Sequence, residues 1–230
     1  MSDASAGLAA ELATRVLATA RAMNASGINR GSAGNVSARC AGGFIITPTG
    51  MAYDTCSAAD MVKVMQSGIQ ADGADGTANG LRKPSSEWRF HRDIYAARPE
   101  AGAVVHTHSP FATALACQEM GVPAFHYMVA RFGGTDVRCA AYATFGSQEL
   151  SDAILVALED RCACLMAHHG MVVFGRDCDH ALALAVELET LCEQFWRVLQ
   201  LGAPKLWPAD EMTRVLAKFA SYGQQGGQQD

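Results

Sequence analysis

Histidine residues follow two apolar segments of the sequence. His106 and His108 stand at the end of AGAVVHTH, and His169 is the second histidine of LMAHHG. Alternate residues of a strand face the same side, so His106 and His108 can present both imidazoles to one ion. A third histidine after a second strand completes the three protein ligands of a typical catalytic zinc site. The spacing predicts a metal centre, and the alternative is a group of hydrogen-bonded core histidines.

Glu87, within KPSSEWRFH, is the candidate fourth ligand. Its place at the expected start of a helix offers a second explanation, because the helix dipole favours a carboxylate there. The remaining histidines are expected to be structural or exposed, namely His91, His126, His168 and His180.

Three short turns contain the small residues that suit anion binding. GSAGNVS brings Gly31, Gly34 and hydroxyl and amide side chains into one turn, where backbone N–H groups can converge on an anion. ITPTG offers Thr49 and Gly50, and the serines of KPSS precede a helix whose first N–H groups are free. Each turn alone is weak evidence, but beside a metal centre the three suggest a small phosphorylated substrate. Neither a GKS/T nor a GxGxxG motif occurs, so nucleotide binding has no support.

The composition is that of a globular chain of 230 residues, of which 50% are hydrophobic and 18% are charged. A net charge of -5 without long basic runs argues against nucleic acid as a partner. No apolar segment is long enough to span a membrane and the first residues do not resemble a signal peptide, so we expect a cytoplasmic protein without a membrane partner. The eight cysteines are scattered without a CxxC motif, which favours reduced, buried thiols.

Apolar periodicity and turn residues predict helices and strands in alternation. The expected helices cover residues 8–23, 87–97, 111–119, 147–160, 179–200 and 209–222, and the expected strands cover 35–39, 44–47, 61–65, 101–108, 162–169 and 170–174. Gly42 and Gly43 separate the first two strands as in a hairpin, and Ser85 or Ser86 is expected to cap the second helix. The pattern predicts one α/β domain over residues 1–223, an α/β/α sandwich around a mainly antiparallel sheet, and a disordered tail at 224–230.

Taken together and in this order, several motifs resemble those of the class II aldolase/adducin family: GSAGNVSAR, ITPTG, KPSSEWRFH, AVVHTHSP, FHYMVARFGG, CAAYATFGS, HHG and KFASYG. The resemblance extends over nearly the whole chain, and the Gly/Asp-rich stretch near residues 71–80 is its main variable part. It is greatest to the sugar-phosphate aldolases of the family, and it implies a metal-dependent lyase and a homotetramer.

The resemblance also implies roles for individual residues. The family's zinc ligands correspond to Glu87, His106, His108 and His169, and Mn²⁺ or Co²⁺ could replace Zn²⁺ in the same ligand set. Its phosphate-binding turns correspond to Ser32, Asn35, Thr49, Gly50, Ser85 and Ser86. Its catalytic tyrosine corresponds to Tyr127, which would reach the active site of a neighbouring subunit. Its aromatic residues on the aldehyde side correspond to Phe145, Phe219 and Tyr222.

The implied reaction is the retro-aldol cleavage of a ketose 1-phosphate to dihydroxyacetone phosphate and an aldehyde. Zinc could stabilise the enediolate charge as a Lewis acid. A Schiff-base mechanism would instead need a lysine in an apolar pocket, and no lysine of this sequence has an obviously apolar setting. We expect Glu87 to leave the zinc when substrate arrives and to act as general base, and Tyr127 to protonate the departing aldehyde oxygen. For Tyr127, packing at a subunit interface is the alternative.

Other members of the family catalyse other reactions, so alternatives remain. The epimerases carry aspartate where this chain has Glu87, which favours an aldolase. A decarboxylase of a sugar phosphate is a further alternative, and so is an adducin-like interaction domain without a metal, although the four candidate ligands argue against the latter. In FHYMVARFGG, Arg131 and Phe132 stand where small residues are expected in a fuculose-phosphate enzyme of this family. The substrate is therefore expected to be either L-fuculose 1-phosphate or a ketose phosphate with a less polar aldehyde end. The latter would be 5-deoxy- or 5-methylthio-ribulose 1-phosphate, in a salvage reaction.

Overall fold

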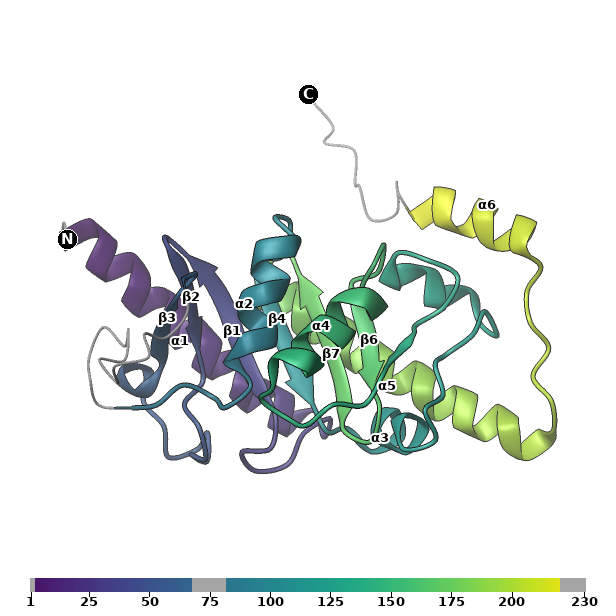
Figure 1. The fold of residues 1–230 in the computed structure, drawn as a ribbon, viewed down its shortest axis with the longest axis horizontal. Coiled ribbons are helices and arrows are strands. Elements are labelled where there is room, and N and C mark those ends of the chain that lie inside the picture. The colour runs from purple at the N-terminus through teal and green to yellow at the C-terminus, as the bar shows by residue number, and fades with distance from the viewer. Residues whose placement is uncertain (1–2, 68–81, 220–230) are drawn as a thin grey trace, which may run out of the picture.

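A seven-stranded sheet forms the centre of the computed structural model, which describes residues 3–67 and 82–219 (Figure 1). Its strands are β1 (Asn35–Cys40), β2 (Gly43–Ile46), β3 (Val62–Met65), β4 (Ala103–Thr107), β5 (Cys139–Ala140), β6 (Ala163–Met166) and β7 (Gly170–Gly175). Their order across the sheet is β3-β2-β1-β4-β7-β6-β5, and only the β5/β6 pair is parallel. The predicted mainly antiparallel sheet is confirmed.

Helices cover both faces of this sheet. They are α1 (Asp3–Ala25), α2 (Trp88–Ala97), α3 (Pro110–Ala116), α4 (Gln148–Ala157), α5 (Cys178–Leu201) and α6 (Ala209–Phe219), and two 3-10 helices cover Ala58–Asp60 and Tyr127–Phe132. In Figure 1, α2 and α4 lie in front of the sheet and α1 and α5 lie behind it. The α/β/α sandwich is thereby confirmed.

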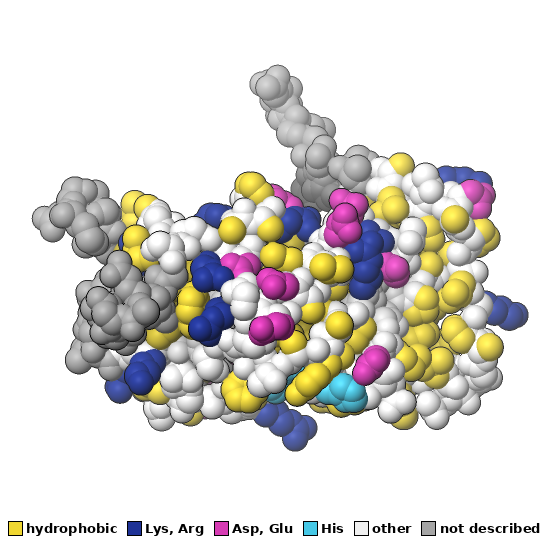
Figure 2. Space-filling model, viewed as in Figure 1, with side chains coloured by type: hydrophobic (Ala, Val, Ile, Leu, Met, Phe, Trp, Pro, Cys, Tyr) yellow, Lys and Arg dark blue, Asp and Glu magenta, His cyan; other side chains and the backbone are white. Residues whose placement is uncertain are grey.

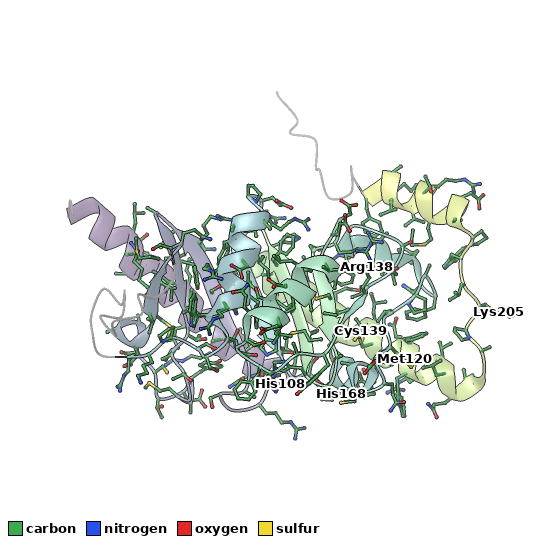
Figure 3. The ribbon with its side chains drawn as sticks, viewed as in Figure 1. His108, Met120, Arg138, Cys139, His168 and Lys205 are labelled. Carbon is green, nitrogen blue, oxygen red and sulfur yellow. The ribbon has the colours of Figure 1, made fainter. Side chains whose placement is uncertain are left out.

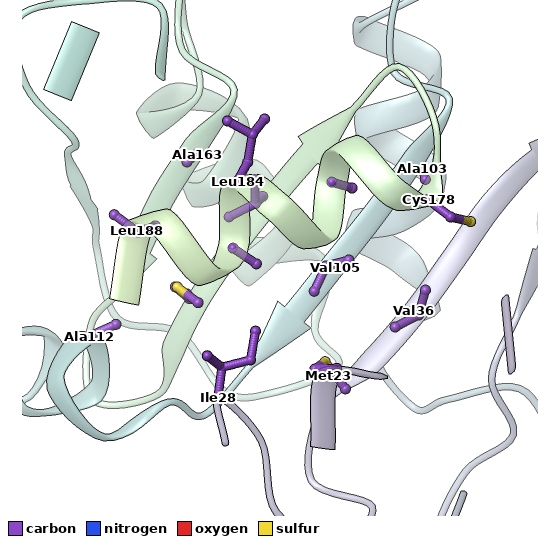
Figure 4. Packing of buried hydrophobic residues seen from close by; sticks show 14 of the residues in the cluster. Met23, Ile28, Val36, Ala103, Val105, Ala112, Ala163, Cys178, Leu184 and Leu188 are labelled. Atoms are coloured by element: carbon purple, nitrogen blue, oxygen red, sulfur yellow. The ribbon is translucent and has the colours of Figure 1, made fainter. Parts of the chain in front are cut away.

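Two hydrophobic clusters fill the layers, because side chains alternate along each strand. Val105 of β4 belongs to the cluster on the face of α1 and α5, where Figure 4 shows it near Met23 and Leu184. Val104 belongs to the other cluster, with Phe90 of α2. His106 shares the face of Val104 and therefore points toward α2.

Most predicted elements agree with the structure, including the hairpin of β1 and β2, in which Cys40 pairs with Gly43. Two local expectations are wrong. The residue that precedes α2 as its N-cap is Glu87, without a side-chain hydrogen bond, instead of Ser85 or Ser86. His108 lies just beyond the end of β4, because the chain turns there into α3. The tail at 224–230 and Tyr222 lie outside the described residues.

Two expectations about the chain's environment can be compared with the structure. Among the described residues, no helix is both long and apolar enough to cross a membrane. All eight cysteines are free thiols, as expected, but the expected burial holds only for Cys56, Cys164, Cys178 and Cys192, and Cys117 is exposed.

Candidate active site

Four side chains from three parts of the fold converge at one end of the sheet. Glu87 precedes α2, His106 is the last residue but one of β4, His108 follows β4, and His169 lies in the turn between β6 and β7. One ligand atom from each lies within 4.8 Å of the others. The Nε2 atoms of His106 and His108 are 3.1 Å apart, and Glu87 Oε2 lies 3.1 Å from His106 Nε2. Glu87 Oε1 lies 3.2 Å from His169 Nε2.

The donor set fits a metal ion in both geometry and chemistry. A tetrahedral zinc site with bonds of about 2.1 Å separates its ligand atoms by about 3.4 Å, close to the distances observed here. Glu87 is buried, and its Oε1 accepts no hydrogen bond, an arrangement that normally costs free energy unless a cation is bound. His106 Nδ1 lies 2.9 Å from the carbonyl oxygen of Met171. If Nδ1 donates to that oxygen, the lone pair of Nε2 faces the cluster.

The electrostatics of the cluster also favour a cation. Burial raises the pKa of Glu87, but His106, His169 and Asn35 together outweigh it and lower that pKa to about 2. Burial and then the charge of His106 lower the pKa of both His108 and His169 to about 4. The pKa of His106 is raised, because the nearby carboxylate of Glu87 outweighs the opposite effect of burial. At neutral pH the site therefore holds the ionised carboxylate of Glu87 and the neutral imidazoles of His108 and His169, the forms that bind metals, whereas a proton on His106 would leave when a metal binds.

Two glycines allow the backbone to pass close to these ligands. A Cβ atom on Gly170, the last residue of HHG, would lie 2.4 Å from the carbonyl oxygen of Thr107 and 3.2 Å from the ring of His108. A Cβ atom on Gly34 would lie 2.4 Å from the carbonyl oxygen of His106. Both positions exclude larger residues for steric reasons.

A buried acid on α5 fixes the chain just after His108. Glu189 accepts hydrogen bonds from the Ser109 hydroxyl at 2.7 Å and from the backbone N–H groups of Phe111 and Ala112 at 2.8 and 2.9 Å. These N–H groups lie in the first turn of α3, where no intrahelical partner exists. No motif in the sequence indicates this role of Glu189.

The three turns expected to bind phosphate meet beside the cluster. The backbone N–H of Thr49 donates to Lys83, and that of Ser85 donates to Thr47, both at 3.0 Å. The N–H of Thr47 in turn donates to Val36, which follows Asn35. Ser32, Thr49, Gly50 and Ser86 are exposed, whereas Ser85 is buried. The Asn35 side chain is also buried, and it donates to Glu87 Oε2 at 2.9 Å.

A cavity of about 310 Å³ opens beside the cluster. It is lined by Ala33, Ser86, Glu87, His108, Tyr142, Ala143, Phe145, His168 and His169. Of the residues expected on the aldehyde side, Phe145 lies here. Tyr142 and His168, whose rings are 5.9 Å apart, were not expected, although His168 is the first histidine of HHG. Figure 3 places His108 and His168 at the same end of the sheet, and Figure 2 shows histidine side chains exposed along that edge.

Other expected residues lie elsewhere in the chain. Tyr127 is 48% exposed and stacks on Phe219 with ring centroids 6.4 Å apart, and neither residue lines this cavity. Phe132 is buried in the core, and Arg131 pairs with Glu187 of α5 at 3.2 Å. Within one chain, neither Arg131 nor Phe132 lines this cavity.

His91, expected to be structural or exposed, is fully buried behind Glu87. Its Nε2 lies 2.5 Å from Asn35 Oδ1, and Asn35 contacts the carboxylate of Glu87. The sequence signal that could have identified His91 is its spacing of four residues from Glu87, which places both on one face of a helix.

The chain is similar to several known proteins of one family. The family described as Class II Aldolase and Adducin N-terminal domain matches residues 14–196. A 5-methylthioribulose-1-phosphate/5-deoxyribulose-1-phosphate aldolase of Rhodospirillum rubrum is 53% identical over 204 residues, which cover 89% of each chain. An L-fuculose phosphate aldolase of Escherichia coli is 39% identical over 214 residues, which cover 93% of this chain and 96% of the relative. A solved L-fuculose 1-phosphate aldolase has a TM-score of 0.85 at 30% identity, covering 91% of this chain and 96% of the other.

Proposed function

The chain belongs to the class II aldolase and adducin N-terminal domain family, and from this premise we propose that it cleaves 5-deoxyribulose 1-phosphate and 5-methylthioribulose 1-phosphate to dihydroxyacetone phosphate and an aldehyde. As a class II aldolase it is a carbon–carbon lyase. The observation that carries the proposal is the Glu87/His106/His108/His169 cluster, which lies beside a cavity and beside the three turns.

The choice of substrate has two supports. The relative named for these two ribulose phosphates is 53% identical to the chain, compared with 39% for the fuculose phosphate aldolase. In addition, Tyr142, Ala143 and Phe145 give the cavity an apolar wall. Such a wall suits a methyl or methylthio group better than an additional hydroxyl group. L-Fuculose 1-phosphate is the second candidate substrate.

Each group of the substrate has a proposed place. Glu87, His106, His108 and His169 would hold a zinc ion, or Mn²⁺ or Co²⁺. A metal bound there would supply Lewis-acid stabilisation of the negative charge that develops when the carbon–carbon bond breaks. The exposed residues Ser32, Thr49, Gly50 and Ser86 would bind the phosphate group. Asn35 and Ser85 would hold these turns, because both side chains are buried.

The proton transfers can be assigned by balancing atoms. In the condensation direction, Glu87 takes a proton from the carbon of dihydroxyacetone phosphate, and Tyr127 of a neighbouring subunit gives one to the aldehyde oxygen. Cleavage reverses both transfers, so the hydroxyl next to the breaking bond loses its proton to Tyr127. Protonation of the aldehyde oxygen, which we expected during cleavage, therefore belongs to condensation. The pKa of Glu87, lowered to about 2 in the free protein, gives the ionised carboxylate that condensation requires.

We further propose that the protein is a homotetramer with active sites between subunits. Tyr127 does not line the cavity of its own chain. Large hydrophobic side chains near the end of α5 and beyond are also exposed, including Trp196, Leu201, Leu206 and Trp207. Exposed apolar side chains that gather on one part of a surface are typical of protein–protein contacts.

The test is release of dihydroxyacetone phosphate, followed by coupled NADH oxidation, from 5-deoxyribulose 1-phosphate and L-fuculose 1-phosphate in parallel, with and without chelator. We expect chelator-sensitive release from both and a higher kcat/KM for the ribulose phosphate. A higher kcat/KM for fuculose phosphate would contradict the substrate assignment. Release from neither substrate by protein containing metal would contradict the aldolase function and favour an epimerase or decarboxylase reaction.

A further inference from the structure

A row of buried polar side chains runs from Glu87 into an otherwise apolar layer. Its members are, in order, Glu87, Asn35, His91, Ser37 and Tyr95, and they alternate between β1 and α2 with its N-cap residue Glu87. Successive distances are 2.9 Å from Asn35 Nδ2 to Glu87 Oε2, 2.5 Å from His91 Nε2 to Asn35 Oδ1, 2.7 Å from Ser37 Oγ to His91 Nδ1, and 2.8 Å from Ser37 Oγ to the Tyr95 hydroxyl. No member is more than 5% exposed.

The periodicities of a helix and a strand produce this alternation. Glu87, His91 and Tyr95 are spaced by four residues, which is a rise of about 6 Å along a helix. Asn35 and Ser37 are spaced by two, which is about 6.6 Å along a strand. Because these steps nearly match, each side chain of the helix row meets the next side chain of the strand row.

The direction of every hydrogen bond in the row follows from its end at Glu87. An ionised carboxylate only accepts, so the amide nitrogen of Asn35 donates to it and Asn35 Oδ1 accepts from His91 Nε2–H. His91 Nδ1 then has no proton and accepts from the Ser37 hydroxyl, which leaves the oxygen of Ser37 to accept from Tyr95. Burial, followed by the charge of His106, lowers the pKa of His91 to about 3, so the ring is neutral, as this order requires.

The surroundings argue that the row has more than a packing role. The His91 ring lies between Phe90 and Phe44, with centroid distances of 4.6 and 6.4 Å. Apolar residues would fill this layer without the desolvation cost of buried polar groups. The row nevertheless ends at Oε2 of Glu87, and the other carboxylate oxygen, Oε1, has no hydrogen-bond partner.

We propose that Tyr95, Ser37 and His91 are positioning residues that fix the orientation of the Asn35 amide, and that this amide holds Glu87 with Oε1 directed toward the three imidazoles. The inference rests on the proposed function, since it takes Glu87 to be a metal ligand. Without the row, the Asn35 amide could rotate and place its oxygen against the carboxylate. That contact would repel Glu87 and weaken the metal site.

The experiment measures the affinity of the metal-free protein for Co²⁺, by absorption titration against a chelator, in Ser37→Ala, Tyr95→Phe and Ser151→Ala. Ser151 is the matched control, because it is equally buried and its hydroxyl donates at 2.7 Å to Asp93, outside the row. Loss of a residue that supports a metal ligand typically costs 10- to 100-fold. We therefore expect Ser37→Ala to bind Co²⁺ at least about 10-fold more weakly. Tyr95→Phe, which removes only the outermost donor, should have a smaller effect in the same direction, and Ser151→Ala should match the wild type.

Kinetics and unfolding separate positioning from a structural role. At saturating metal, Ser37→Ala should lower kcat while KM stays near the wild-type value, and its urea midpoint should resemble that of Ser151→Ala. Equal Co²⁺ affinity in Ser37→Ala and Ser151→Ala would overturn the proposal. This result is distinguishable from failure of the proposed function, which is absence of cleavage by the metal-loaded wild type. The Co²⁺ affinities can be compared whether or not cleavage occurs.

Discussion

At the scale of single residues, the two carboxylate oxygens of Glu87 are in different surroundings. Oε2 accepts from Asn35 and lies near His106, whereas Oε1 has no hydrogen-bond donor and lies near His169. The neighbouring imidazoles keep the pKa of the buried carboxyl well below its usual value. One side chain can therefore serve both as a metal ligand and as a base.

The substitution Glu87→Gln tests this double role. Glutamine keeps the size of the side chain but can neither take up nor give a proton as the carboxyl group does. Because cleavage requires Glu87 to return a proton to the carbon of dihydroxyacetone phosphate, kcat for cleavage should fall by about 10² or more even in metal-loaded protein. Metal content by elemental analysis and kcat should be measured on the same preparation. The control is Glu193→Gln, since Glu193 is a half-buried residue of α5 that pairs with Arg197 and not with the cluster. Full activity in a metal-containing Glu87→Gln variant would contradict the assignment of the base.

At the scale of elements, the site depends on how closely β4 and β7 approach each other. His108 has left β4, and its ring lies against Gly170, the first residue of β7. Glycine is thus required at position 170 because the backbone of Thr107 and the ring of His108 leave no room for a side chain. A positive φ angle is not the reason, since Gly170 does not have one.

Gly170→Ala should therefore disturb the fold and the site together. Its Cβ would overlap the carbonyl oxygen of Thr107, so we expect the free energy of unfolding to fall by about 2 kcal/mol or more. Urea unfolding and the Co²⁺ titration would measure the two effects. Gly7→Ala in α1 is the control, since no atom lies within 4 Å of its Cβ and alanine favours a helix. Wild-type stability and wild-type Co²⁺ affinity in Gly170→Ala would refute the close-contact explanation.

At the scale of the whole molecule, the four candidate ligands join parts of the chain that are far apart in sequence. They lie before α2, at the end of β4 and between β6 and β7. A bound cation would hold these parts together, whereas Tyr127 lies outside the cavity of its own chain.

Removal of the metal should lower the melting temperature. A ligand present at about 1,000 times its Kd stabilises the folded state by about 4 kcal/mol, which corresponds to about 8–16 °C for a chain of this size. Differential scanning calorimetry before and after dialysis against chelator measures the shift. His169→Ala serves as control and should respond much less to chelator. Identical melting of the dialysed and untreated wild type would contradict metal binding at this cluster.

Mixing two inactive variants tests whether active sites lie between subunits. Glu87→Gln and Tyr127→Phe should each be nearly inactive alone. In randomly assembled tetramers, half of the sites contain an intact Glu87 and half of those face an intact Tyr127, so about a quarter of the wild-type activity should return. Coexpression of the two variants and a kcat measurement test this expectation. Mixtures that stay inactive, although mass spectrometry shows mixed tetramers, would place Tyr127 outside the neighbouring site.

The sequence by itself determined much of this protein. Strand alternation and helical spacing predicted the elements of the sandwich, and HxH, HHG and Glu87 identified the four residues that the fold brings together. These features could be read because they depend on local periodicity and on ligand chemistry. The turns were recognisable as well, from glycine and hydroxyl residues alone.

Only the tertiary structure decided which neighbours these residues meet. Local spacing cannot show that Asn35 donates to Glu87 instead of facing solvent, that His91 continues a buried row, or that Glu189 caps α3 from a distance of 80 residues in sequence. These contacts arise where a helix crosses a strand or another helix. Because they are buried, losing one partner would leave a polar group unpaired, at a cost in free energy. The sequence specifies the chemical groups, and the packing of layers specifies their partners.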